Sequence, residues 1–378
     1  MSKRISAIDW IKFLLAGFIL CLHYGELCVP WTWGSMEILH GANLAVEGFF
    51  LISGFLFMQS LEKYEKTGAY PACPKVVFHR YLGIFYWLLP AAILDAILVA
   101  TSVEQPSTAD FLATLPRLLF EIVPLQMAGF SPWCVTGVSW YISALLLAVL
   151  FFYPLARRNP RAFAREFCPI AAVVLYGLLS HLTGTLGDPG AWLFGVVRKG
   201  LLRGLADMAL GCFLYECIRA TKDEIVTGFR RALYTIAATV SAFLCVLIMV
   251  FTHTSVYDFV FLLPAFAFLY LAIGQKTVFA LFLNHNWTRH IGTASTAVFL
   301  VHYPLARYFA IWYPLDRSFF VTYLLDVLAA ATIVFFAGLL FKWVVNVLSR
   351  PKATDLEELE DFAEELTETE EIEEKGAR

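Results

Sequence analysis

The sequence is short of charged residues, and that shortage excludes an ordinary soluble fold. Only 16% of its 378 residues are charged, whereas 59% are hydrophobic and the mean hydropathy is +0.68. A soluble domain carries about 25% charged residues. We therefore expect an all-α integral membrane protein, in which the few ionisable side chains inside apolar runs mark candidate functional positions.

Other absences limit how the chain is organised. The eight cysteines show no paired metal-ligand spacing, so no metal site is expected and most are interpreted as small buried residues. Cys28 and Cys134 are both placed at the outer face, and their pairing stays open. There is no Gly/Ser linker, internal repeat or second soluble domain, so residues 1–350 are expected to form one transmembrane domain. No small-residue cleavage site follows the first apolar run, which is typical of an uncleaved signal anchor.

Apolar length predicts about ten transmembrane helices, and the positions of Lys and Arg place both termini in the cytoplasm. The predicted spans are about 7–27, 44–60, 81–101, 138–156, 167–186, 201–218, 232–252, 256–273, 291–311 and 319–346. The charge bias agrees at nearly every turn, except at Arg198 and Lys199. Residues 102–137, which Pro116 and Pro124 interrupt, are expected to form an outer-face or re-entrant element.

The net charge of −3 combines two unlike parts. Residues 355–374 hold twelve Asp or Glu and no Lys or Arg, while residues 1–354 hold 26 basic and 19 acidic residues, a balance of +7. Residues 351–378 are therefore predicted to be a solvated, disordered or loosely helical cytoplasmic tail, with a docking role as the alternative. The basic residues are scattered between spans, so no nucleic-acid partner is expected.

The first predicted helix carries an unusual polar stripe. Asp9, Lys12, His23 and Glu26 lie on nearly one face at 3.6 residues per turn. Because lipid penalises such a stripe, it is expected to face the protein interior or a wet cavity. Snorkelling at the helix ends would explain three of these residues, but it does not explain His23, which lies about 16 Å beyond Lys12. His23 is therefore a candidate general base.

Two further predicted helices carry polar residues that could join His23. Glu47 begins the second span and is predicted to be level with His23, where it could orient the imidazole; a plain interfacial carboxylate is the alternative. Ser53 with its neighbouring glycines suits close helix contact. His302 lies mid-span, and Pro304 beside it predicts a broken helix lining a cavity; a structural hydrogen bond is the alternative reading of His302.

Two other pairs of residues are weaker candidates. Arg203 and Asp207 are spaced for an ion pair within one helix, and an internal structural bridge is the favoured interpretation. Trp140 and Tyr141 are typical of an aromatic belt at the end of a span, with a sugar-stacking platform as the alternative.

A basic cluster precedes the third predicted span. It consists of Lys75, His79 and Arg80, close together on the cytoplasmic side. Such a cluster is suited to binding phosphates, but the positive-inside bias alone would produce the same residues.

With these residues identified, the chain resembles the acyltransferase 3 family of polytopic bacterial membrane acyltransferases over most of residues 5–345. The most specific elements are Lys12 followed by ten positions and His23, and then Val-Glu-Gly-Phe-Phe-Leu-Ile-Ser-Gly-Phe at 46–55. Weaker elements are Ser-Trp-Tyr-Ile-Ser at 139–143, Arg-Gly-Leu-Ala-Asp-Met-Ala-Leu-Gly at 203–211 and Val-His-Tyr-Pro at 301–304.

The resemblance implies transfer of an acyl group, commonly acetyl, from acyl-CoA to a hydroxyl of a cell-surface or exported glycan or its lipid-linked precursor, in the bacterial inner membrane. His23 and Glu47 would be catalytic, with Glu26 as the alternative partner of the imidazole, and Lys12 and Arg80 would contact the donor. Acyl-CoA would be a co-substrate, and no bound cofactor is expected. The chain departs from the family in having Glu at position 47, where Asp is frequent, and only one arginine, Arg80, before the third span.

A transporter or flippase for a glycan or small acid is the alternative, although the repeated halves common in transporters are not found.

Overall fold

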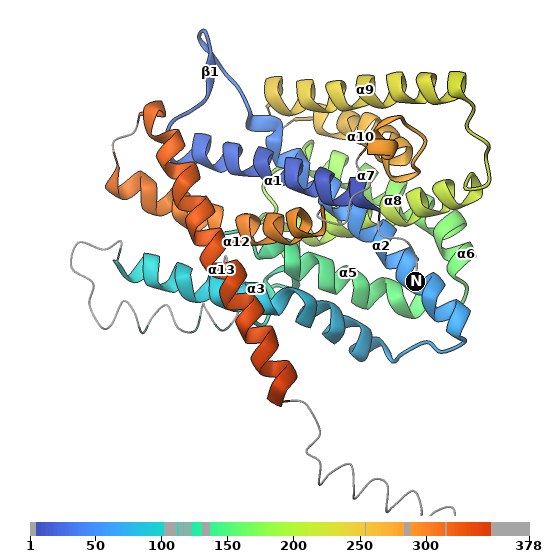
Figure 1. Ribbon diagram of the computed structural model, residues 1–378, viewed down its shortest axis with the longest axis horizontal. Coiled ribbons are helices and arrows are strands. Elements are labelled where there is room, and N and C mark those ends of the chain that lie inside the picture. The colour runs from blue at the N-terminus through green and yellow to red at the C-terminus, as the bar shows by residue number, and fades with distance from the viewer. Residues whose placement is uncertain are drawn as a thin grey trace, which may run out of the picture.

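The computed structural model describes residues 5–101, 122–130, 137–253, 255–282, 288–313 and 316–348, together with Leu112, Pro116 and Leu119. Most of these residues are helical (Figure 1). In chain order the elements are α1 Ser6–Leu27, β1 Thr32–Trp33, β2 Met36–Glu37, η1 His40–Leu44, α2 Ala45–Thr67, α3 Cys73–Thr101, η2 Gln126–Ala128, α5 Trp140–Ala156, α6 Pro160–Ala162, η3 Phe163–Phe167, α7 Cys168–Thr183, β3 Trp192–Leu193, β4 Val197–Arg198, α8 Lys199–Ala220, α9 Gly228–Phe251, α10 Tyr257–Ile273, α11 Phe279–Phe282, α12 Thr288–Trp312, η4 Arg317–Phe319 and α13 Phe320–Leu348. The strands form two short antiparallel hairpins.

A helix lies at each of the predicted spans, which confirms the all-helical prediction. Six helical stretches of the described residues are long and apolar enough to cross a membrane, and α5 and α10 are shorter apolar helices. The six stretches are Ser6–Leu27, His40–Thr67, Cys73–Leu98, Pro160–Thr183, Gly228–Phe251 and Arg317–Val347. The number of spans and their orientation stay predictions.

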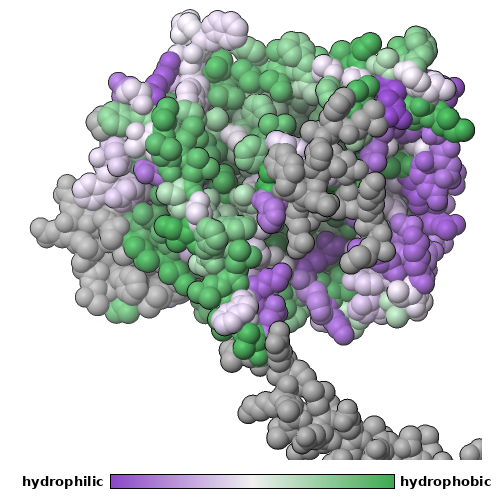
Figure 2. All heavy atoms as spheres, viewed as in Figure 1, coloured by the Kyte–Doolittle hydropathy of each residue, from purple (hydrophilic) through white to green (hydrophobic). Residues whose placement is uncertain are grey.

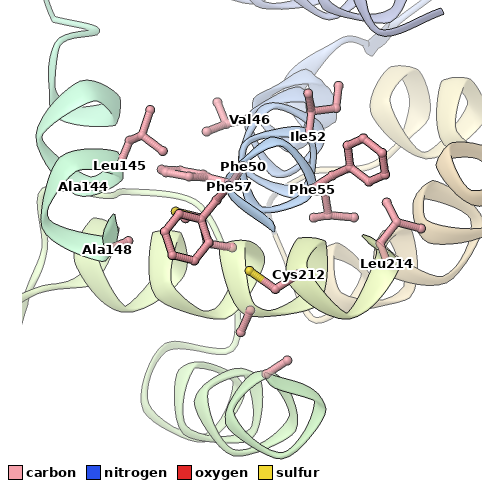
Figure 3. Close-up of a cluster of buried hydrophobic side chains, with 14 of the residues drawn as sticks. Val46, Phe50, Ile52, Phe55, Phe57, Ala144, Leu145, Ala148, Cys212 and Leu214 are labelled. Atoms are coloured by element: carbon pink, nitrogen blue, oxygen red, sulfur yellow. The ribbon is translucent and has the colours of Figure 1, made fainter. Parts of the chain in front are cut away.

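Helices α2 and α8 pack closely at the centre of the bundle, because glycines on both let the backbones approach. A Cβ at Gly54 would collide with the carbonyl of Met208, and a Cβ at Gly211 would collide with the carbonyl of Leu51. Small residues at helix crossings have this role in membranes, where lipid supplies no hydrophobic drive for association. Apolar side chains of α2, α5 and α8 fill the space around this crossing (Figure 3).

Helices α1 and α12 form the second main contact and lie side by side (Figure 1). Two contacts show that they run parallel. Asp9 packs on Gly292 near the start of both helices, and the Cys28 thiol lies 3.5 Å from the Ala306 carbonyl near their ends. Helix α13 crosses this pair and α3 obliquely, and Gly338 lies against the backbone of Tyr86 at that crossing. Residues of α1, α3, α12 and α13 form a core cluster of their own, which holds the α1–α12 pair in place.

The described part of the segment predicted as outer-face or re-entrant lies between α3 and α5. The Tyr81 hydroxyl of α3 donates to the Ile122 carbonyl at 2.6 Å, and the Met127 amide donates to the Ser143 hydroxyl of α5 at 3.0 Å. Contacts with α5 and with a residue two turns into α3 favour the re-entrant alternative. The remaining residues of this segment, including Cys134, lie outside the described residues, as does the acidic tail; Cys28 has a free thiol.

The surface has the polarity of a protein that faces lipid. Figure 2 shows apolar residues over much of one face and hydrophilic residues gathered at the right-hand end, near the end of α2 and α6. Helix α9 exposes Leu233, Ile236, Val240 and Phe243, each by 49% or more. A contiguous apolar surface of this kind is unusual in a soluble monomer and fits contact with a bilayer.

Candidate active site

The polar stripe of α1 faces α12 and the helices beside it, as its predicted avoidance of lipid requires. Asp9 is buried against Gly292, and Lys12 lines a cavity with Ser295 of α12. About three turns further along, the ring of His23 contacts α12 instead of turning toward lipid. The two parallel helices therefore carry one row of polar groups through the bundle.

The imidazole of His23 is oriented by Glu26. Its Nδ1 lies 2.9 Å from Oε2 of Glu26, one turn further along α1. A carboxylate can only accept a hydrogen bond, so Nδ1 carries the proton and, in the neutral ring, Nε2 keeps a lone pair. The two side chains are 20% and 45% exposed, so molecules outside the protein can reach the pair. This arrangement is that of a general base held by a carboxylate.

The ring of His302 stacks on that of His23, with centroids 5.4 Å apart and planes inclined by 23°. His302 is fully buried, and its Nδ1 donates to the Val298 carbonyl at 3.2 Å. Its Nε2 is then a hydrogen-bond acceptor, and it has no partner among the described residues. Tyr303 packs edge-on against His23 at 4.8 Å. The prediction of a broken helix here was wrong, because α12 continues through Pro304.

A cavity of about 140 Å³ lies between the two histidines and the start of α1 and α12. Its polar lining comes from four helices: Lys12 of α1, Ser53 of α2, Tyr141 of α5, and Ser295 and Thr296 of α12. Three residues that the sequence singled out separately, Lys12, Ser53 and Tyr141, are thus brought together. The Ser53 hydroxyl donates its single proton to the Phe49 carbonyl at 2.8 Å, so the Tyr141 hydroxyl must donate to Ser53 across the 2.9 Å between them.

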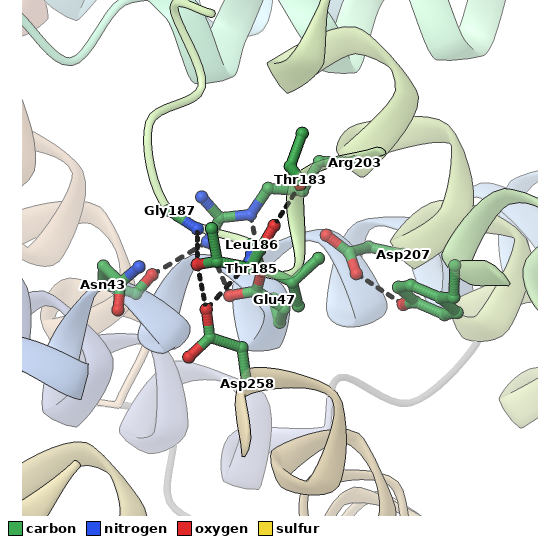
Figure 4. A network of polar contacts seen from close by, with 10 residues as sticks. Asn43, Glu47, Thr183, Thr185, Leu186, Gly187, Arg203, Asp207 and Asp258 are labelled. Carbon is green, nitrogen blue, oxygen red and sulfur yellow. Dashed lines mark hydrogen bonds and ion pairs between the residues drawn. The ribbon is translucent and has the colours of Figure 1, made fainter. Parts of the chain in front are cut away.

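Glu47 does not reach His23, and its predicted pairing with the imidazole was wrong. Gly48, the next residue, packs on Leu15, which is about 12 Å of helical rise short of His23. Instead Glu47 receives two hydrogen bonds from Arg203, at 2.5 and 2.7 Å, and Arg203 also donates to the Asn43 carbonyl (Figure 4). Both charged side chains are buried, so the pair satisfies two charges that neither helix could bury alone.

The predicted ion pair between Arg203 and Asp207 is also absent from the part of the chain that the structure describes. The Tyr176 hydroxyl of α7 donates to Asp207 at 2.5 Å, and Figure 4 shows this carboxylate apart from the Arg203–Glu47 pair. The two charged side chains of α8 therefore contact neighbouring helices instead of each other. Arg203 pairs with Glu47 of α2, and Asp207 accepts a hydrogen bond from Tyr176 of α7. An internal bridge within α8 would have left Glu47 buried without a counter-charge.

The comparisons with known proteins agree with the resemblance seen in the sequence. The model of the acyltransferase 3 family, described as an acyltransferase domain, matches residues 5–347, nearly the whole chain. The chain belongs to the acyltransferase 3 family. Its activity class is therefore that of a membrane acyltransferase. No curated protein matches the chain, and no solved structure does.

In this acyltransferase 3 domain, the aromatic pair at the start of α5 does not form a belt. Trp140 is buried, and its ring lies 6.2 Å from Phe50 and 5.6 Å from the guanidinium of Arg203. Tyr141 points into the cavity beside Ser53. Trp140 offers no exposed face for a sugar and Tyr141 faces the cavity, so neither the belt nor the platform interpretation describes the pair.

Arg80 of the acyltransferase 3 domain contacts α2 near the opposite end of the bundle from His23. Its guanidinium donates to the Ser60 hydroxyl at 2.8 Å and lies over the ring of Phe57 at 5.5 Å. Ile84, one turn further along α3, lines the cavity that contains Lys12. An arginine has five N–H donors, and this hydrogen bond uses one of them.

Sequence reasoning missed a buried acid of the acyltransferase 3 domain, Asp258 in the first turn of α10. One carboxylate oxygen accepts hydrogen bonds from the Thr185 hydroxyl at 2.6 Å and the Leu186 amide at 2.8 Å, so Asp258 fixes the loop after α7 (Figure 4). Its position gave a usable signal, since it is an acid within a predicted span. The partners could not be foreseen, because they lie in a loop.

Proposed function

We propose that this membrane acyltransferase transfers an acyl group, acetyl in the simplest case, from acyl-CoA to a hydroxyl of a cell-surface or exported glycan or its lipid-linked precursor. The observation that carries the proposal is the His23–Glu26 pair, a carboxylate-held imidazole that is partly exposed at one end of the bundle. His23 takes the place of the general base, and Glu26 takes the orienting role that the sequence offered to either Glu47 or Glu26.

The reaction follows from the protonation states of this pair. Nε2 of His23 removes the proton of the acceptor hydroxyl as its oxygen attacks the thioester carbonyl. The tetrahedral intermediate collapses by breaking the C–S bond, and the proton on His23 passes to the departing CoA thiolate. The products are an ester on the acceptor and free CoA thiol, and His23 returns to its neutral form. Glu26 stabilises the imidazolium that forms between the two proton transfers.

His302 supplies the second contact of the acceptor. Its Nε2 is a buried acceptor without a partner among the described residues, and a buried polar atom of this kind costs about 1–3 kcal/mol if it stays unpaired. A second hydroxyl on the same sugar, or the reacting hydroxyl before its transfer to His23, would satisfy it. An acceptor rich in adjacent hydroxyls suits two neighbouring imidazole rings.

The donor is proposed to enter from the end of the bundle that carries Arg80. Arg80 contacts the phosphates, and Lys12 attracts the anionic donor into the cavity. The cavity of about 140 Å³ is far too small for a whole acyl-CoA, so it receives only the acyl end and the arm that carries it. Holding the donor and the acceptor along one axis accelerates the reaction, because the reacting groups are already close and correctly oriented. The protein is proposed to act in the bacterial inner membrane as a multi-pass protein.

The test is to replace His23 by Ala in cells that make the glycan and to measure ester-linked acyl groups on the glycan by NMR. We expect a loss of about 10²–10⁴-fold in transfer rate and a normal amount of folded protein. His181→Ala is the matched control, because His181 is an exposed histidine of α7 that takes no part in the site. Retained acylation in His23→Ala would remove His23 from the mechanism. If the purified protein does not consume acyl-CoA, the proposal that acyl-CoA is the donor is contradicted.

A further inference from the structure

Tyr323, in the first turn of α13, contacts both of the helical turns that carry the two histidines. Its hydroxyl donates to the backbone carbonyl of His302 at 2.9 Å, and its ring centroid lies 4.9 Å from that of Tyr24, the residue next to His23. The Tyr323 side chain is fully buried. It therefore acts on the site through these contacts and not by touching a substrate.

The turn of α12 that carries His302 is short of one backbone hydrogen bond. Pro304 has no N–H, so the Leu300 carbonyl, four residues earlier, cannot accept the usual helical bond from that position. Helices often kink at such a proline, yet α12 continues through this one. The Tyr323 hydroxyl supplies a hydrogen bond from outside the helix within the same turn. It thus holds the backbone of His302 where the bonding of α12 itself is weakened.

The ring of Tyr323 also holds the turn of α1 that carries His23. Tyr24 is buried, and its hydroxyl donates to the Asp316 carbonyl at 3.3 Å, close to the start of α13. Packed aromatic rings prefer a few relative orientations, so the contact between Tyr24 and Tyr323 restricts how α1 can shift. Because Tyr24 and His23 are consecutive residues of one helix, any shift of Tyr24 moves His23 as well. Tyr323 therefore joins α1 and α12 at the level of the stacked imidazole rings.

We propose that Tyr323 is a positioning residue that sets the separation of His23 and His302. The inference rests on the proposed function, in which both imidazole rings face the acceptor. One sugar can contact both Nε2 atoms only while those atoms keep a fixed separation. A misplacement of about 1 Å can slow an enzyme about 100-fold, even when the altered residue lies away from the reacting atoms. The hydroxyl of Tyr323 is therefore expected to matter more for the rate than for the stability of the fold.

The experiment uses membranes from cells that produce the full chain and its glycan, supplied with increasing concentrations of acetyl-CoA. Ester-linked acetyl groups on the glycan are released with alkali and quantified by mass spectrometry. Tyr323→Phe keeps the ring and removes only the hydroxyl. We expect kcat to fall by about tenfold or more, while KM for acetyl-CoA changes by less than about twofold, because the donor does not contact this residue.

Tyr153→Phe is the matched control for the loss of a buried hydroxyl. Tyr153 of α5 is also fully buried, and its hydroxyl also donates to a backbone carbonyl, that of Pro71, at 2.6 Å. Both variants lose one hydrogen bond of the same kind, so we expect similar decreases in the thermal unfolding temperature in detergent. Only Tyr323→Phe is expected to lower kcat.

A double-variant cycle with His302→Ala shows whether the hydroxyl acts through His302. His302→Ala keeps the general base, His23, so transfer stays measurable. In this background Tyr323→Phe has no imidazole left to position on α12. We expect it to lower kcat by less than about twofold there, against about tenfold in the wild-type background.

Three results would overturn the positioning role and leave the proposed function intact. They are a wild-type kcat in folded Tyr323→Phe, an equal fall of kcat in Tyr153→Phe, and an undiminished effect of Tyr323→Phe when His302 is already Ala. Wild-type membranes that transfer no acetyl group would contradict the proposed function itself.

If Tyr323→Phe does not fold, Tyr24→Leu tests the other contact from α1. This variant leaves the hydroxyl of Tyr323 in place and removes the ring that packs on it. We expect the same fall of kcat with an unchanged KM for acetyl-CoA. An unchanged kcat in Tyr24→Leu would overturn the proposal.

Discussion

His23 and His302 stack on each other, with ring centroids 5.4 Å apart, although one lies in the first helix of the chain and the other in α12. Each ring has its Nδ1 engaged as a donor, to Glu26 in one case and to the Val298 carbonyl in the other. Both Nε2 atoms are consequently acceptors in their neutral rings. A site with two adjacent acceptors and a carboxylate behind one of them is suited to removing a proton from a hydroxyl.

Replacing Glu26 by Gln is predicted to lower acyl transfer by about tenfold or more without unfolding the protein. The amide can still hydrogen-bond to Nδ1, but it no longer stabilises the imidazolium that forms during transfer, and it allows the other tautomer. Transfer rates in membranes across pH 5–9 provide the measurement. Glu26→Asp is the control, because it keeps the negative charge on a shorter side chain, and we expect it to retain more activity than Glu26→Gln. Equal activity of wild type and Glu26→Gln would show that the carboxylate does not orient the base.

Breaking the Glu47–Arg203 pair is predicted to destabilise the protein more than it impairs chemistry. Removing one partner of a buried ion pair leaves an uncompensated charge, at a cost of about 3–5 kcal/mol. Glu47→Gln and Arg203→Met should each lower the thermal unfolding temperature in detergent, and the double variant should unfold at a higher temperature than either single variant. A Glu47→Gln protein of normal stability that transfers no acyl group would instead return Glu47 to the catalytic site.

The helices and the stripe of α1 could be predicted because they depend on local sequence. An apolar run of sufficient length forms a helix whatever surrounds it, and the 3.6-residue period alone places Lys12 and His23 on one face. The pairing of His23 with Glu26 is equally local, since the two are separated by a single turn. The sequence left two alternative partners for the His23 imidazole, Glu26 and Glu47. It could not decide between them, because the decision depends on how far α2 extends along α1.

The non-local contacts of the site could not be predicted. Glu47 meets Arg203 because glycines bring α2 and α8 together, and nothing near either residue specifies that crossing. The contact between Phe49 and Phe299 gave no signal at all, since the chain contains 34 phenylalanines and these two are distinguished only by where they meet. Spacing along one helix gave the wrong partner for Arg203, because a membrane protein satisfies its buried charges between helices as readily as within them.

Adding one methyl group at the α2–α8 crossing is predicted to destabilise the bundle. In Gly54→Ala the new Cβ would meet the backbone of Met208 and Gly211, which cannot move as a flexible side chain can. Overpacking at such a site costs about 1–3 kcal/mol. Gly177→Ala in α7 is the matched control, because no atom lies within 4 Å of its Cβ position and Ala is the better helix former. The two variants should shift the thermal unfolding temperature in opposite directions, and equal shifts would mean that the crossing can relax.

The ion pair between Glu224 and Lys276, outside the spans, is predicted to make stability depend on pH on the acid side. The hydrogen bonds that Lys276 and the Tyr234 hydroxyl donate to its carboxylate lower the pKa of Glu224 below its ordinary value. A carboxyl whose folded pKa is lowered stabilises the native state above its unfolded pKa of about 4.3, and that contribution is lost as the pH falls through the lower folded pKa. Unfolding temperatures of the wild type measured from pH 7 down to pH 3 should therefore fall more steeply than those of Glu224→Gln. Curves that stay parallel over this range would show that the pair contributes nothing, whereas convergence toward pH 3 would assign the acid sensitivity to this carboxylate.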